Sequence, residues 1–190
     1  MRTFIISQPK AGTYLCANLL VELGLKHTGM HCKGTGKYQA YDLDDPDAIH
    51  KGPEYTKEKG NFMQVLDLIP DNAFAVGHLE YTDKHIDALK NFKKVLVTRP
   101  FKDFDAALER FQKEMNRKVA INKNKYEKIK KWNDEQDVFM INFYDMIDKN
   151  EKKIDELQMH LFGEVRVNSL TAITNALEAK SLTKTSLRES

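Results

Sequence analysis

The sequence has little of several features that would assign it to a specialised class. Its 190 residues include two cysteines, too few for the disulfide framework of a small secreted domain. No apolar run is long enough to cross a bilayer, and the first ten residues lack the apolar core and cleavage site of a signal peptide. The formal net charge of +2 is too small to indicate nucleic acid as a partner. We therefore expect a cytoplasmic protein that binds neither membranes nor nucleic acid.

What the sequence does contain is an alternation of short apolar runs with amphipathic segments. A composition of 41% hydrophobic and 31% charged residues suits one soluble domain over residues 1–190. Apolar residues spaced three and four apart predict helices between the runs. We predict a three-layer, P-loop-like α/β fold, with a mostly parallel central sheet of about four to five strands flanked by helices. The predicted strands are 3–7, 73–77, 94–98 and 138–142.

Two segments do not follow this alternation. Residues 28–56 are rich in Gly, Asp and Pro and are predicted to be an irregular excursion. His27, His31 and Cys32 lie near its start, but their spacing matches no familiar zinc pattern. Residues 117–137 are rich in lysine, which usually marks a solvated helix face. A weaker hypothesis is that these lysines steer an anionic acceptor.

The turn after the first predicted strand has the composition of a phosphate-binding loop. Gly12 allows the backbone to approach an anion closely, and the amides after it would point at that anion from the positive end of a helix. Lys10 adds a positive charge, and Thr13 adds a hydroxyl donor. The loop is not a Walker A element, because its lysine precedes the glycine. A tight strand-to-helix turn without a ligand is the alternative interpretation.

Four motifs, in order, resemble those of sulfotransferases that depend on 3′-phosphoadenosine 5′-phosphosulfate (PAPS). Residues 9–15, PKAGTYL, resemble the loop P-K-[SA]-G-T-[TS]-[WL] that binds the 5′-phosphosulfate. Residues 76–79, VGHL, resemble K-T-H-L, which contains the catalytic histidine. Residues 99–103, RPFKD, resemble the segment with the 3′-phosphate arginine. Residues 143–146, FYDM, resemble F-Y-E-D-[LM], whose tyrosine approaches the adenine.

This resemblance implies an enzyme that transfers a sulfuryl group from PAPS to a hydroxyl or amine acceptor, with PAP as the second product and no metal. His78 would be the general base, since a neutral imidazole accepts a proton near neutral pH. Lys10 would act in catalysis by stabilising charge on the leaving phosphate. Arg99 would bind the 3′-phosphate, Tyr144 would contact the adenine, and Arg188 is a further candidate for the 3′-phosphate. The expected donor-binding residues are Lys10, Ala11, Gly12, Thr13, Tyr14, Arg99, Tyr144 and Arg188.

Departures from the family pattern keep two alternatives open. Val76 stands where many members have a lysine, Ala107 replaces a serine that supports the arginine, and Tyr14 replaces a small hydroxyl residue. A non-catalytic domain that binds PAPS or PAP is therefore one alternative. The other is a P-loop-like nucleotide kinase, which would require Mg²⁺ and a carboxylate to hold it. The acceptor, whether small molecule, glycan or peptide, is not indicated, because specificity resides in loops that vary within a fold.

Overall fold

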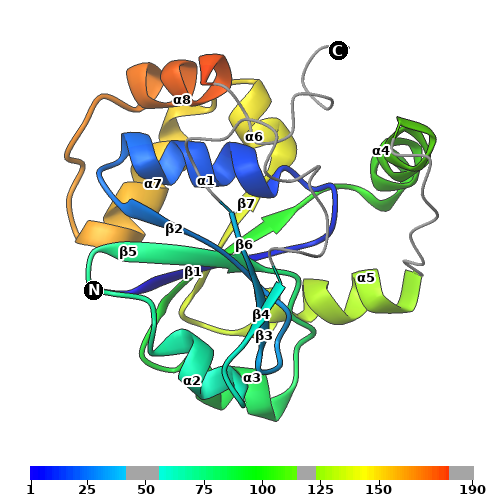
Figure 1. Ribbon diagram of the computed structural model, residues 1–190. Coiled ribbons are helices and arrows are strands. Elements are labelled where there is room, and N and C mark those ends of the chain that lie inside the picture. The colour runs from blue at the N-terminus through cyan, green and yellow to red at the C-terminus, as the bar shows by residue number, and fades with distance from the viewer. Residues whose placement is uncertain (42–55, 115–122, 180–190) are drawn as a thin grey trace.

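The computed structural model describes residues 1–41, 56–114 and 123–179 and has a central sheet between two groups of helices (Figure 1). The strand order is β4-β3-β2-β5-β1-β6-β7. β2, β5, β1, β6 and β7 are parallel, whereas β3 and β4 extend one edge as antiparallel strands. The strands are β1 (Thr3–Ser7), β2 (Lys26–Cys32), β3 (Lys37–Ala40), β4 (Thr56–Glu58), β5 (Ala73–Gly77), β6 (Lys93–Thr98) and β7 (Val138–Asn142).

The predicted α/β class and mostly parallel sheet are confirmed, but the predicted number of strands is wrong. The sheet has seven strands rather than about four to five, and β2, β3 and β4 are the additional ones. Most of β2 and all of β3 lie in the segment predicted to be irregular, of which residues 42–55 lie outside the described part. β2 was not predicted because most of its residues are polar and give no apolar run. In the structure, its register on β5 shifts between His27 and His31. Gly29, at φ 71°, lies at this irregularity.

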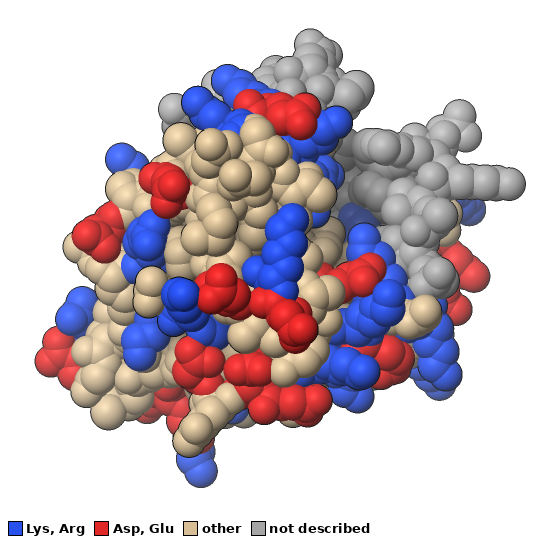
Figure 2. Space-filling model, turned by 90° about the horizontal axis from the view of Figure 1, so that it is seen from below, with Lys and Arg blue, Asp and Glu red and all other residues tan. Residues whose placement is uncertain are grey.

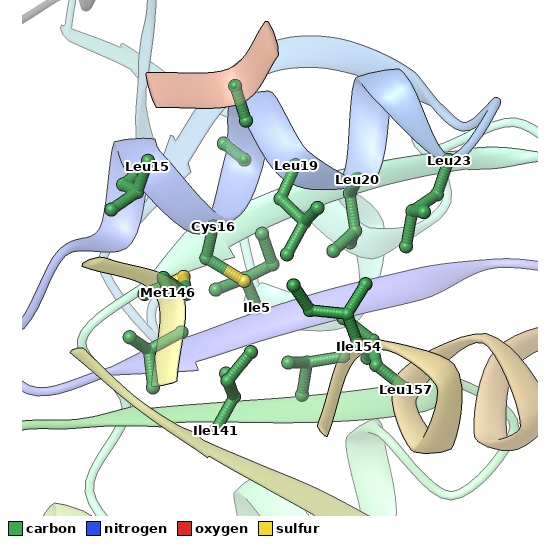
Figure 3. Packing of buried hydrophobic residues seen from close by; sticks show 14 of the residues in the cluster. Ile5, Leu15, Cys16, Leu19, Leu20, Leu23, Ile141, Met146, Ile154 and Leu157 are labelled. Carbon is green, nitrogen blue, oxygen red and sulfur yellow. The ribbon is translucent and has the colours of Figure 1, made fainter. Parts of the chain in front are cut away.

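The middle strand, β1, forms the centre of the core. All of its residues are buried, and they alternate between the two faces of the sheet. Phe4 and Ile6 face one cluster of buried residues, and Ile5 faces the other. Figure 3 shows Ile5 between Leu19 of the helix above it and Ile141 of β7. Full burial of each large apolar side chain stabilises the fold by about 1.5–3 kcal/mol.

Helices cover both faces of the sheet, as expected for strands joined by parallel crossovers (Figure 1). Among the described residues, no helix is both long and apolar enough to span a bilayer. α4 projects beyond the sheet and contacts α5 through Phe104 and Tyr126. One face carries α1 (Thr13–Glu22), α6 (Phe143–Ile147), α7 (Glu151–Phe162) and α8 (Ser169–Glu178), and the other helices are α2 (Phe62–Leu66), α3 (Asp83–Ala88), α4 (Phe101–Glu114), α5 (Lys123–Lys130) and the 3-10 helix η2 (Lys131–Asp134).

The described part of the lysine-rich segment forms α5 and η2 and packs on the sheet by its apolar side. Ile129 and Trp132 are fully buried, and the Trp132 indole N–H donates to the Leu79 carbonyl oxygen at 3.0 Å. Lys128 pairs with Glu80 on the solvent side. In the view from below, basic and acidic side chains of the described residues are interspersed (Figure 2). Steering of an anionic acceptor by this segment stays a prediction.

Candidate active site

The loop between β1 and α1 is shaped by two residues with positive φ. Lys10 has φ 60°, which is unusual for a residue with a side chain, and Gly12 has φ 94°. The Ala11 amide donates to the Gln8 carbonyl oxygen at 3.1 Å and closes the turn. Gly12 is the N-cap of α1 and makes no side-chain capping bond, so the N-cap residue leaves the first amides of the helix without a side-chain acceptor. This arrangement suits an anion.

A chain of hydrogen bonds joins His78, after β5, to Thr13 at the start of α1. His78 Nδ1 lies 2.9 Å from the Ser7 carbonyl oxygen and 3.0 Å from Ser7 Oγ. A carbonyl oxygen only accepts, so Nδ1 carries the proton and Nε2 carries the lone pair of the neutral ring. Ser7 Oγ also lies 2.7 Å from Thr13 Oγ1. If Ser7 accepts from His78 and donates to Thr13, the Thr13 hydroxyl proton is left for a ligand.

Burial and nearby lysines keep His78 neutral at physiological pH. Burial is the main cause that lowers the pKa of His78 from 6.5 to about 4, although its hydrogen bond to the Ser7 carbonyl opposes the shift. The positive charges of Lys125, Lys33 and Lys10 lower the pKa further. These lysines come from α5, from the turn after β2 and from the loop before α1. They therefore surround the imidazole with positive charge from three parts of the chain.

A second histidine lies against the first. The ring centroids of His31, in β2, and His78 are 4.7 Å apart in an edge-to-face arrangement. His31 Nδ1 lies 3.0 Å from the hydroxyl oxygen of Tyr14, in the first turn of α1. Burial lowers the pKa of His31 well below its ordinary value and raises that of Tyr14, so both groups are uncharged near neutral pH.

Arg99 follows β6 and lies beside the loop. Its Nη1 donates to the Lys10 carbonyl oxygen at 3.4 Å, while its buried Nε has no hydrogen-bond partner in the structure. Its backbone N–H donates to the side-chain oxygen of Gln8 at 3.2 Å, and the amide nitrogen of Gln8 donates to the Tyr126 carbonyl oxygen. The Tyr126 hydroxyl donates to the Arg99 carbonyl oxygen. Gln8 therefore joins the ends of β1 and β6 to α5.

Phe143, the first residue of α6, contacts both the loop and Arg99. The Arg99 guanidinium carbon lies 4.2 Å from the centroid of the Phe143 ring. A Cβ atom at Gly12 would lie 2.7 Å from Phe143 Cδ2, so only glycine fits there. The adjacent Tyr144 is 39% exposed, and its hydroxyl donates to an Asp103 carboxylate oxygen at 2.8 Å. Tyr144 thus lies on the surface side of α6, next to the ring that contacts Arg99.

The structure brings most of the predicted residues to one edge of the sheet, where the parallel strands have their carboxyl ends and where ligands bind such sheets. Ala11 is buried under the loop and contributes its backbone. Val76 and Ala107 are both buried, and Val76 belongs to the same core cluster as Ile5. Arg188 lies outside the described residues. The predicted residues near the loop are Lys10, Gly12, Thr13, Tyr14, His78 and Arg99.

Sequence analysis missed four residues of this edge. Ser7 and Gln8 precede the recognised motif, and Phe143 stands beside the tyrosine that the motif singled out. His31 was considered only as a metal ligand. Each of these residues lies at or next to the end of a strand, and this position was the only sequence signal for them. Their contacts with one another could not be predicted, because they depend on which strands are neighbours in the sheet. Among the described residues, no cluster of three or more His, Cys, Asp or Glu side chains could bind a metal ion.

Comparison with known proteins bears on the fold. No protein-family model matches the chain, and no curated protein matches it. Among solved structures, that of mouse sulfotransferase SULT7A1 complexed with PAP matches with a TM-score of 0.58 and 14% sequence identity. The match covers 93% of this chain and 64% of the mouse chain, so this chain spans less than two thirds of that protein's length. At this identity the similarity shows the fold alone: the chain has a sulfotransferase-like α/β fold.

Proposed function

We propose that the protein is a sulfotransferase that moves a sulfuryl group from PAPS to a hydroxyl or amine acceptor. The observation that carries the proposal is the hydrogen-bonded chain from His78 through Ser7 to Thr13. Through Ser7, it links a neutral imidazole with a defined lone pair to Thr13, which follows the loop of residues 8–12 that we call the anion loop. Such a link suits a reaction in which the base and the leaving phosphate act together. The similarity in fold to a sulfotransferase that was solved with PAP supports the same proposed function.

The residues present fit the two phosphate groups of the donor. Lys10, the first amides of α1 and the Thr13 hydroxyl suit the 5′-phosphosulfate. The unpartnered, buried Nε of Arg99 is a polar atom that a 3′-phosphate would satisfy. Tyr144 is exposed beside this site and is the proposed contact for the adenine. No metal is required in this proposal, because the fixed cations supply the positive charge.

In the proposed reaction, the acceptor oxygen forms a bond to sulfur while the bond from sulfur to the 5′-phosphate oxygen breaks. His78 Nε2 takes the acceptor's proton, and the electron pair of the broken bond stays on the leaving phosphate oxygen. Lys10 and Thr13 stabilise that developing charge. A positioned general base contributes about 10²–10⁴-fold in rate. An anion beside Lys10, Lys33 and Lys125 offsets their charge, so the pKa of His78 rises and Nε2 becomes a stronger base.

Ligand-induced thermal stabilisation tests the donor site. PAP at about 100 times its Kd stabilises the folded state by about 2.7 kcal/mol, which corresponds to an increase of about 5–10 °C in melting temperature for a chain of this size. We expect AMP, which lacks the 3′-phosphate, and ATP with Mg²⁺ to stabilise much less. Equal stabilisation by all three would contradict the proposal, and turnover of ATP with Mg²⁺ would favour the kinase alternative.

A His78→Ala variant separates catalysis from binding. Formation of PAP from PAPS is measured with a panel of phenols, alcohols, sugars and amines as acceptors. We expect the variant to bind PAP within about threefold of the parent and to lose about 10²–10⁴-fold of any activity. His160→Ala, at the opposite end of the sheet, is the matched control. Unchanged activity in His78→Ala would remove His78 from the mechanism, and a parent that binds PAP but turns over no acceptor would favour the non-catalytic alternative.

A further inference from the structure

We propose that Tyr14 and His31 form a positioning pair for His78: Tyr14 holds the His31 ring, and the His31 ring in turn fixes the His78 ring and excludes water from one side of it. This inference rests on the proposed function, since positioning has a catalytic meaning only if His78 is the base. Neither residue is placed in contact with the reacting atoms. Their role is to act through His78.

The contacts that carry the inference come from three separate elements. His31 is 8% exposed at the end of β2, where it meets His78 edge-to-face at a centroid distance of 4.7 Å. Tyr14, on α1, bonds His31 Nδ1 at 3.0 Å and lies edge-on to the ring of Tyr41 at 6.4 Å. The His31 ring therefore cannot rotate without breaking a hydrogen bond inside a packed aromatic group.

The His78 imidazole is surrounded by groups from several elements, and the pair supplies one of them, the His31 ring. Ser7, on β1, accepts from its Nδ1 and defines the tautomer. His31, on β2, packs against its ring as an uncharged group. The charged groups that act on it are Lys125 on α5, Lys33 after β2 and Lys10 in the loop. His31 is thus the neutral aromatic member of this shell, and removal of its side chain would admit water next to His78.

This arrangement also explains a departure seen in the sequence. A small hydroxyl residue at position 14 could not reach His31 across the space that the Tyr14 side chain spans. Tyr14 keeps its backbone amide in the first turn of α1, while its side chain points toward β2. One residue therefore serves both the anion loop and the shell of the base. Tyr14 in α1 and His31 in β2 would be required together.

Nuclear magnetic resonance of the imidazole nitrogens tests the pair without any acceptor. In the unliganded protein, spectra at pH 7.5 report the tautomer of His78, and a pH titration reports its protonation midpoint. In His31→Ala we expect the midpoint to rise by about one pH unit or more, since entry of water relieves part of the cost of burying the charged ring. Tyr14→Phe, which keeps the ring and removes the hydrogen bond, should move it in the same direction by less. His160→Ala is the matched control and should leave it unchanged.

Kinetics then show whether the effect is catalytic. In His31→Ala we expect kcat to fall about 10- to 100-fold, the acidic limb of the rate profile to move upward with the His78 midpoint, and PAP affinity to change by less than about threefold. A lower melting temperature with an unmoved midpoint, tautomer and pH profile would overturn the inference, because His31 would then be merely structural. If the midpoint moves as expected but the parent fails to bind PAP, the positioning contact stands and the proposed function falls.

Discussion

Replacing Gly12 with alanine tests the geometry of the anion loop through two separable costs. The backbone at Gly12 is left-handed, with φ 94°, and an alanine in this conformation lowers the stability of the fold by about 1–2 kcal/mol. Its Cβ would also lie 2.7 Å from Phe143 Cδ2 and 3.3 Å from Met146 Cε. Since Phe143 is a ring packed on Arg99, relief of this overlap requires movement of α6, and overpacking of this kind costs about 1–3 kcal/mol. The expected loss in free energy of unfolding is therefore about 2–5 kcal/mol.

Gly24 provides a matched control at the other end of the same helix. Its φ is 93°, nearly the value at Gly12, but a Cβ there would meet nothing within 4 Å. Gly24→Ala should therefore cost only the backbone contribution of about 1–2 kcal/mol. The difference between the two variants isolates the contact between the loop and Phe143, and should exceed about 1 kcal/mol.

Urea unfolding followed by the fluorescence of the single, buried tryptophan, Trp132, measures both costs. Isothermal titration with PAP measures the effect on the site. We expect Gly12→Ala to weaken PAP binding at least about tenfold, or about 1.4 kcal/mol, because Arg99 loses its support. Gly24→Ala should bind PAP like the parent. Equal destabilisation by the two alanines, or unchanged PAP binding in Gly12→Ala, would refute the steric argument.

Two further predictions concern charge. Arg99→Lys keeps the charge but loses the guanidinium N–H groups, so we expect PAP affinity measured by calorimetry to fall about 10- to 100-fold while AMP affinity stays the same; an equal loss for both ligands would show that Arg99 does not read the 3′-phosphate. Burial lowers the pKa values of His78 and His27 to about 4, below the 6.5 of the unfolded chain, so the unfolded state binds more protons between those values and stability falls as pH decreases through them. Denaturant unfolding at pH 7 and pH 5 should show a loss of about 2 kcal/mol for each histidine, and a flat profile would contradict their burial as neutral groups.

The sequence predicts β1, β5 and β6 because these strands are short, apolar and almost fully buried, and it also predicts β7, an apolar edge strand that is only partly buried. β1, β5 and β7 have the predicted bounds, and β6 begins one residue earlier than predicted. β3 and β4 carry few apolar residues and lie at the edge, where pairing rather than burial defines a strand. α8 is not among the predicted helices, and its buried residues are mainly small, with Ser169, Ala172 and Ala176 beside Ile173.

The site could be predicted only as far as local motifs extend. Gly12 and Thr13 belong to a recognisable strand-to-helix turn, and His78 and Arg99 each follow a predicted strand. Ser7 and His31 carry no such local mark, since their importance comes from β1, β2 and β5 being neighbours in the sheet. No spacing along the chain specifies that His31 contacts His78, because 46 residues lie between them and only the strand order brings the two rings together.

If the protein binds PAPS as proposed, the Phe143 ring bears on which nucleotides fit the site. It contacts the loop at Gly12 on one side and the Arg99 guanidinium on another, so it lies between the two places where the proposal expects negative charge. Because an aromatic ring is rigid, we expect it to limit how closely the Arg99 guanidinium can approach the loop. We would then expect a nucleotide to contact both the loop and Arg99 only if its two anionic groups are spaced to reach both. A nucleotide with a different spacing would contact only one of them.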